Sequence, residues 1–177
     1  RSPEALENVL TKLQSCISDM KQWMMVNKLK LNDTKTEFFV AASAHNLRNF
    51  PDVKLNLDGT LISPTETIRN LGVIFDTRMS MSPHISHICR TVTYHLRNIA
   101  RIRRFIDKSA CHNAVRSLVL SRLDYCNGLL SSIPSTQLER VQRLQNWAAR
   151  LVFQVSREHP SRPLLNSLHW IPLKQRI

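Results

Sequence analysis

Glycine is scarce in this sequence, with 3 among 177 residues, and 8 prolines accompany them. So few turn-forming residues argue against disorder and against an all-β fold rich in turns. Three glycines also cannot build the glycine-rich loop that holds phosphates in nucleotide-binding proteins. The hydrophobic fraction of 42% is nevertheless sufficient for the core of one domain or of two small ones.

Long apolar runs are absent as well. No stretch of about 18 apolar residues occurs, and the opening RSPEALENVL does not resemble a signal peptide, so we expect no membrane contact. Because the chain starts at Arg1 rather than Met, we expect it to be a piece of a longer polypeptide. Four widely spaced cysteines without a Cys-x-x-Cys pair predict reduced thiols and an intracellular location, in the nucleus or the cytoplasm: Cys16, Cys89, Cys111 and Cys126.

Adjacent carboxylates are missing from the whole chain. Metal-ion nucleotidyl transfer needs clustered carboxylates that hold two divalent ions close together. The acidic residues of the first part occupy ordinary turn positions instead, so we expect this chain to bind no cofactor by itself. These scattered acids include Asp33, Glu37, Asp58 and Asp76.

A zinc site is the less favoured interpretation of the histidines and cysteines. His84, His87 and Cys89 would be crowded onto one helical turn, and the paired ligand spacing of structural zinc sites is missing. Cys111 and His112 downstream could complete such a set. We expect a polar first helical turn here, with Cys89 and Cys111 packed between helices.

Acidic residues are also rare in the second part of the chain. Residues 1–77 contain 9 Lys and Arg against 9 Asp and Glu, whereas residues 78–177 contain 16 against 4. The whole net charge of +12 therefore lies after residue 77. This asymmetry predicts a neutral scaffold followed by a module that binds phosphates or another anionic surface.

The segment from Ser82 to Lys108 carries the clearest pattern. Its apolar residues recur at steps of three and four, which predicts one amphipathic helix. A second row lies on the opposite side at the same spacing and contains no acid, whereas a solvated face usually mixes both signs. The apolar row is Ile85, Ile88, Val92, Leu96, Ile99, Ile102 and Ile106, and the basic row is Arg90, Tyr94, Arg97, Arg101, Arg104 and Lys108.

Four further helices follow from the same periodicity. A long helix begins with Ser2 as N-cap, ends near Asn27 and packs Trp23 on its flank. The next ones run over 107–123 with Asp107 as N-cap, from a cap at Ser135 through Val152, and over 164–168. The residues expected inward are Leu6, Leu10, Leu13, Ile17, Met20 and Met24 in the first, Ala110, Ala114, Val115, Leu118 and Leu123 in the second, and Leu138, Val141, Leu144, Ala148, Leu151 and Val152 in the third.

Short strands are expected between the first two helices. Residues 28–32 and 35–42 read as extended segments, and residues 53–62 alternate around Asp58-Gly59, a strong hairpin signal. Residues 67–76 read as one strand, in which Gly72 relaxes a bulge or admits a second backbone. The predicted fold class is α+β: a small antiparallel β region with a long helix, followed by a basic helical bundle.

Three stretches together carry a resemblance to a known family. They are WMMVNKLKLNDTKTE from Trp23 to Glu37, NLGVIFD from Asn70 to Asp76, and LLNSLHWIPLKQRI at the end. In this order they resemble the C-terminal part of the reverse transcriptase of non-LTR (LINE-type) retrotransposons, of the jockey or chicken-repeat kind. The resemblance covers nearly the whole chain, and Trp-x-x-x-Asn-x-Leu-x-Leu-Asn-x-x-Lys-Thr-Glu is its most specific motif.

The resemblance implies three parts. Residues 1–77 would be the end of the polymerase palm, residues 78–160 the basic helical thumb, and residues 161–177 a truncated C-terminal connector. Lys35 corresponds to the family's lysine that gives a proton to the pyrophosphate leaving group. The primer grip, a hairpin that holds the primer 3′ end, corresponds to Asn70, Leu71, Gly72 and Val73.

The thumb would grip the template–primer duplex, either RNA–DNA or DNA, through its phosphates. The nucleic-acid-binding residues implied are Arg90, Tyr94, Arg97, Arg101, Arg104, Lys108, Arg140 and Arg143. The family's catalytic aspartates would lie upstream of Arg1, so this chain alone is not expected to polymerise. Mg²⁺ and deoxynucleoside triphosphates would belong to the full-length RNA-directed DNA polymerase. The sequence leaves the oligomeric state open.

Two alternatives remain at this point. The same thumb could serve in a non-enzymatic nucleic-acid-binding protein that derives from a retrotransposon. The arginines could instead meet an acidic protein, which would make the chain a helical interaction module. Salt dependence separates these classes, because duplex binding through about six phosphates weakens steeply with rising salt.

Overall fold

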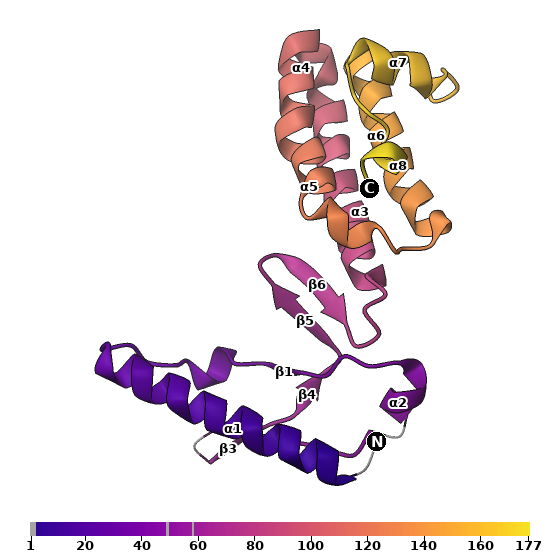
Figure 1. The fold of residues 1–177 in the computed structure, drawn as a ribbon. Coiled ribbons are helices and arrows are strands. Elements are labelled where there is room, and N and C mark those ends of the chain that lie inside the picture. Colours follow the sequence, from indigo (N-terminus) through magenta and orange to yellow (C-terminus); the bar gives the residue numbers. More distant parts are fainter. Residues whose placement is uncertain (1–2, 49, 58) are drawn as a thin grey trace. The chain divides into compact units, whose positions relative to one another are not determined.

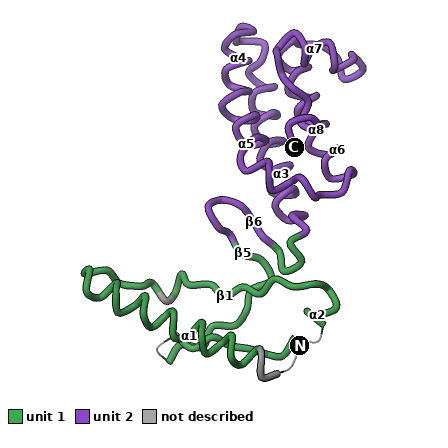
Figure 2. The backbone as a smooth tube through the Cα atoms, viewed as in Figure 1, with its two compact units in different colours: residues 1–68, 76–79 green, residues 69–75, 80–177 purple. Residues whose placement is uncertain are grey.

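The computed structural model describes residues 3–48, 50–57 and 59–177, which form an α+β fold of helices and two-stranded sheets (Figure 1). This confirms the predicted α+β class, but the prediction of an antiparallel β region was only partly right, because one of the two-stranded sheets is parallel. The chain divides into two compact units, residues 1–68 with 76–79 and residues 69–75 with 80–177, coloured green and purple in Figure 2.

The first unit is built on helix α1 (Pro3–Val26), which packs against strand β2. Its expected N-cap, Ser2, lies outside the described residues. Of the expected inward row, Leu6, Leu10, Leu13, Ile17 and Met24 are half-buried, but Met20 is 52% exposed. The prediction that Trp23 packs was wrong, since its side chain is 62% exposed. A single short hairpin covers only one stripe of a helix, so the flanks of α1 stay open to solvent.

Strands in the first unit are shorter than predicted. Of residues 35–42 only β1 (Phe38–Phe39) is a strand, and it pairs in parallel with β4 (Pro64–Thr65). Residues 28–32 form no strand. Residues 33–35 form a 3₁₀ turn instead (η1, Asp33–Lys35), because the Thr34 hydroxyl donates to Asn32 Oδ1 at 2.7 Å and the Thr36 hydroxyl to the Asn32 carbonyl at 2.9 Å. A short helix, α2 (Ala44–Arg48), follows β1.

The hairpin over residues 53–62 is confirmed. β2 (Leu55–Leu57) pairs antiparallel with β3 (Thr60–Ile62), with Leu55 opposite Ile62 and Leu57 opposite Thr60. Leu55 and Leu57 are buried while Asn56 is exposed, as alternation requires. Asp58 of the expected turn lies outside the described residues, and Gly59 adopts φ +88°.

Residues 67–76 form a hairpin rather than the single strand predicted. β5 (Thr67–Asn70) pairs with β6 (Val73–Asp76) across a turn at Leu71 and Gly72. Both turn residues have positive φ, +47° and +87°, which is the pattern of a type I′ turn. Leucine at the first turn position looks like a strand residue in the sequence, and this concealed the reversal.

The core of the second unit forms around helix α3 (Ser82–Ile102), which packs along α6 (Ser135–Phe153). The predicted apolar row of α3 is confirmed from Ile85 to Ile99, all at most 4% exposed. The predicted length was wrong, because the helix ends at Ile102 rather than Lys108. A 3₁₀ turn, η2 (Arg103–Phe105), follows, so Ile102 is 49% exposed and Ile106 only partly buried.

A π segment interrupts the next helix. Asp107 caps α4 (Lys108–Val115), as predicted, by accepting a hydrogen bond from the Ala110 backbone N–H at 2.7 Å. Residues 116–120 then form the wider π turn, η3 (Arg116–Leu120), before α5 (Ser121–Asp124). The extra residue per turn rotates the chain, so Val119 and Leu120 are buried in place of the predicted Leu118. Val115 and Leu123 are inward as expected, and Ala110 is exposed.

The C-terminal segments pack on α6. A short 3₁₀ turn, η4 (Asn127–Leu130), leads to α6, where Pro134 takes the cap position and Ser135 is the first helical residue rather than the cap. α7 (Ser161–Ser167) begins before the predicted 164–168, and α8 (Leu173–Arg176) ends the chain. The fully buried Gln145 of α6 holds this end by donating to the Ile171 carbonyl at 3.0 Å and accepting from the Leu173 N–H at 3.1 Å.

Three helices end on a left-handed residue that is not glycine. Lys28 after α1, Gln154 after α6 and His169 after α7 have φ between +54° and +60°. In each case the following N–H bonds to a carbonyl five residues earlier, as in Leu29 to Met24, which is the Schellman pattern. A chain with so few glycines thus uses long side chains at positions where glycine is favoured.

A buried arginine joins the ends of α3 and α6. The Arg103 side chain, only 8% exposed, donates Nε to the Leu151 carbonyl at 2.9 Å, Nη2 to the Val152 carbonyl at 2.8 Å and Nη1 to the Ile106 carbonyl at 2.8 Å. Gln154 returns a bond to the Arg103 carbonyl at 3.3 Å. Because the planar guanidinium reaches three carbonyls at once, it fixes the turn after α3 against the last turn of α6.

We expect Arg103→Met to lower the free energy of unfolding by about 3 kcal/mol, because the buried carbonyls lose charge-assisted hydrogen bonds. Arg103→Lys should cost less but still weaken the fold, since one ammonium cannot reproduce the fork. The matched control is Arg104→Met, next in the chain and exposed, for which we expect a change within about 0.5 kcal/mol. Urea unfolding followed by circular dichroism measures all three, and equal effects at positions 103 and 104 would contradict the assignment.

Candidate nucleic-acid interface

Five of the predicted nucleic-acid-binding residues line one open groove of the second unit. Its cavity volume is about 560 Å³, and Ser86, Cys89, Thr93 and Asn98 complete the lining. No acidic side chain lines it in the part of the chain that the structure describes. Helix α3 supplies four of the five residues and α6 the fifth: Arg90, Tyr94, Arg97, Arg101 and Arg140.

The helical period of α3 produces this groove. Steps of three and four residues place these side chains opposite the buried isoleucines, and the core fixes that orientation. Arg90, Arg97 and Arg101 are exposed, and within the described residues none of them forms an ion pair. Tyr94 is 62% exposed and meets His95 edge-on, with ring centroids 5.4 Å apart. The groove thus presents guanidinium groups whose hydrogen-bond donors remain available for a ligand.

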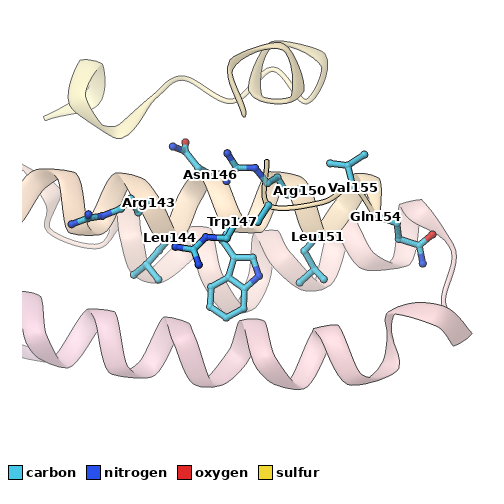
Figure 3. A pocket seen from close by; sticks show the side chains of 9 residues that line it. Arg143, Leu144, Asn146, Trp147, Arg150, Leu151, Gln154 and Val155 are labelled. Atoms are coloured by element: carbon cyan, nitrogen blue, oxygen red, sulfur yellow. The ribbon is translucent and has the colours of Figure 1, made fainter. Parts of the chain in front are cut away.

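The other predicted cations lie elsewhere. Arg104 sits over the Phe105 ring at 4.6 Å and Lys108 over the Phe153 ring at 3.8 Å, so each already contacts an aromatic face. Arg143 lines a separate depression on α6, together with Trp147 (Figure 3). Because α3 ends at Ile102, Arg104 and Lys108 no longer follow its helical period and do not line the groove.

The floor of the groove contains Cys89, which is half-buried. Burial raises the pKa of this thiol, while the charges of Arg140 and Arg143 act in the opposite direction. A raised pKa keeps the thiol neutral at physiological pH, so Cys89 adds no negative charge to the groove. Cys111 is fully buried and its thiol pKa is also raised by burial.

The predicted primer-grip residues form the tip of the β5–β6 hairpin. Asn70, Leu71 and Gly72 are exposed, Leu71 by 82%, whereas the Val73 side chain is buried in the core. The Tyr125 hydroxyl donates a hydrogen bond to the Leu71 carbonyl, and a Cβ at Gly72 would lie 3.6 Å from the Tyr125 ring. The positive φ of the turn therefore favours glycine at this position, whereas the Tyr125 ring would leave room for a Cβ.

His84 connects the same hairpin to α3. Its Nδ1 accepts a hydrogen bond from the Ile74 backbone N–H at 3.4 Å, so the neutral imidazole is the form that fits. Burial lowers the pKa of His84 below its ordinary 6.5, and the charges of His87 and Arg69 lower it further. Neither this role of His84 nor the contact of Tyr125 can be read from residue spacing, because both contacts join residues that only the fold brings together.

Lys35 belongs to the first unit and not to the unit that holds the groove. Its side chain is exposed, and its backbone N–H donates to the Asn32 carbonyl at 3.1 Å, which closes the 3₁₀ turn η1. An exposed lysine at a turn is compatible with reaching a phosphate. Its catalytic role stays a prediction.

Within the described residues, no group of three or more His, Cys, Asp or Glu side chains is placed to hold a metal ion. The described residues therefore do not provide the carboxylate cluster of a polymerase's two-metal centre. None of the helices in the described part of the chain is both long and apolar enough to span a membrane.

Comparison with known proteins gives no relative. No protein-family model, no curated protein and no solved structure matches the chain.

We expect the stability of the protein to fall as the pH drops below about 6.5. The unfolded chain takes up a proton at His84 near that pH, whereas the folded chain does so only at lower pH. The unfolded state thus binds more protons in this range, and stability increases with rising pH. His84→Gln keeps an acceptor for Ile74 without titrating, so its unfolding free energy should depend less on pH. Urea unfolding at about pH 7.5 and pH 5.5 measures this, and an unchanged pH dependence in the variant would contradict it.

Proposed function

We propose that this chain binds the sugar–phosphate backbone of a nucleic-acid duplex through the groove on α3 and α6. The supporting observation is the gathering of four arginines and an exposed tyrosine in one open groove without a lining carboxylate among the described residues. Arginine pairs with phosphate through two parallel hydrogen bonds, and such contacts give affinity and position without reading sequence.

The dimensions of the groove agree with a duplex. Arg90 and Arg101 are eleven residues apart on α3, which corresponds to about 16 Å at 1.5 Å per residue. That length equals the axial rise of about five base pairs at 3.4 Å each. Arg97 lies between them, and Arg140 adds a cation from a second helix. The row can therefore follow one phosphate backbone over several nucleotides.

We further propose that this duplex is the template–primer of a LINE-type reverse transcriptase, of which the chain is the palm edge and thumb. The support is the order of the three motif stretches and the charge step after residue 77. In this proposal Lys35 protonates the pyrophosphate leaving group, and the exposed tip at Asn70, Leu71 and Gly72 touches the primer end. The chain alone holds no carboxylate cluster among its described residues, so it is not expected to polymerise.

Two other functions remain as alternatives. A nucleic-acid-binding protein without catalysis would use the same groove and the same phosphate contacts. A module that binds an acidic protein would also use the arginines, but it would not show the linear dependence of log affinity on log salt that counterion release produces.

The double variant Arg97→Gln/Arg101→Gln should weaken binding to a DNA or RNA–DNA duplex about tenfold or more, to a similar extent for unrelated sequences. The slope of log affinity against log salt should become shallower by about 2, since two phosphate contacts are lost. Fluorescence anisotropy with labelled duplexes of about 16 base pairs between 50 and 300 mM salt measures both quantities.

The matched control is Arg116→Gln/Arg162→Gln, which removes the same charge from exposed positions outside the groove. This control should change affinity only slightly. Equal losses in the two double variants would indicate attraction to net charge rather than to the groove. A salt slope near zero in the unaltered protein would overturn the nucleic-acid proposal and favour a protein partner.

A further inference from the structure

A second depression on α6 has a different chemistry from the groove. Its cavity volume is about 650 Å³, and it lies along α6 and the segment that follows the helix. Figure 3 shows the Trp147 indole projecting from α6, with Leu144 and Leu151 on either side of it. Trp147 is half-buried, packs against the core and lines the depression.

Cations surround this apolar floor. Arg143, Arg150 and Arg157 line the depression, and no acidic side chain lines it among the residues that the structure describes. The Arg150 Nε donates to the His159 carbonyl at 2.8 Å, which fixes that side chain at the rim. Arg143 and Arg157 are exposed and have no ion-pair partner within the described residues. An aromatic floor and a cationic rim together match a ligand that has a flat π system and a phosphate.

We propose that this depression binds unpaired nucleotides of a single strand. A base lies against the Trp147 indole between Leu144 and Leu151, and the neighbouring phosphates pair with Arg143 and Arg157. The inference rests on the proposed nucleic-acid function but uses residues outside the duplex groove, so the two can fail separately. Stacking on the indole accepts every base, so this contact does not depend on base identity.

The duplex itself is a poor ligand for this site. In a duplex the faces of the bases are covered by their neighbours, so only an unpaired base offers a π face to the indole. The floor is also largely apolar, which favours a base over a row of phosphates alone. The other indole of the second unit differs, since Trp170 is only 9% exposed and stacks on His112 at 5.7 Å. Of these two indoles, Trp147 is the one that lines the depression beside the arginines.

The test uses a single-stranded oligo-uridine RNA 12-mer, an oligo-deoxyuridine DNA 12-mer and a blunt duplex. Binding is followed by the quenching of tryptophan fluorescence in a Trp23→Phe background, because Trp23 is exposed in the first unit. Trp147→Leu keeps apolar volume but removes the indole, and Trp147→Phe keeps an aromatic ring. Arg143→Gln/Arg157→Gln removes the rim charges, with Arg116→Gln/Arg162→Gln as its control.

We expect both single strands to quench the fluorescence of the Trp23→Phe protein. Trp147→Leu should weaken single-strand binding about tenfold or more and abolish the quenching, and Trp147→Phe should restore most of the affinity. The rim variant should weaken single-strand binding more than its control. Duplex affinity should remain within about twofold of the unaltered protein for both variants at position 147. Unequal affinities for the RNA and DNA strands would show which of the two the site prefers.

Several outcomes would overturn the inference. Duplex binding without single-strand binding would remove it and leave the proposed function intact, whereas the absence of both would remove the two together. Quenching that persists in Trp147→Leu would place the strand elsewhere. Binding of poly-glutamate with the same dependence on Trp147 would indicate an acidic protein ligand instead. Urea unfolding of Trp147→Leu and Trp147→Phe confirms that each variant is folded before its affinity is interpreted.

Discussion

One guanidinium group determines how the second unit is held together. Arg103 donates to carbonyls on both sides of the junction between α3 and α6, and Gln154 returns a bond to its backbone. Because α3 supplies most of the arginine groove and α6 supplies both Arg140 and the Trp147 depression, this junction fixes the two surfaces relative to each other. A buried cation is costly unless hydrogen bonds compensate for lost hydration, and here three carbonyls accept hydrogen bonds from the guanidinium.

Both surfaces gather positive charge, and no carboxylate among the residues that the structure describes lines either of them. Helix α6 contributes Arg140 to one surface and Arg143 and Arg150 to the other, so like charges are concentrated within three helical turns. Mutual repulsion of this kind opposes the compact state. A bound polyanion would relieve this repulsion, so the proposed binding would raise the stability of the second unit.

The sequence predicted features that depend on local periodicity. The buried row of α3, the cap at Asp107 and the pairing of Leu55 with Ile62 follow from spacing alone. Prediction from the sequence was wrong where backbone geometry changed without a compositional signal, as at the π segment 116–120 and the turn at Leu71 and Gly72. For the candidate site, the arginines of α3 were found from their period. That Arg140 joins them, and that Trp147 lines a depression, depends on packing between distant segments.

The left-handed helix ends have a consequence for evolution and engineering. At Lys28, Gln154 and His169 a side chain occupies a backbone conformation that costs roughly 1 kcal/mol more than it would for glycine. Gln154 lines the Trp147 depression and bonds to Arg103, so there the side chain compensates for its conformation. Lys28 makes no such contact that the structure describes. Replacing Lys28 with glycine would remove this conformational cost, so the present sequence is not the most stable one for this fold.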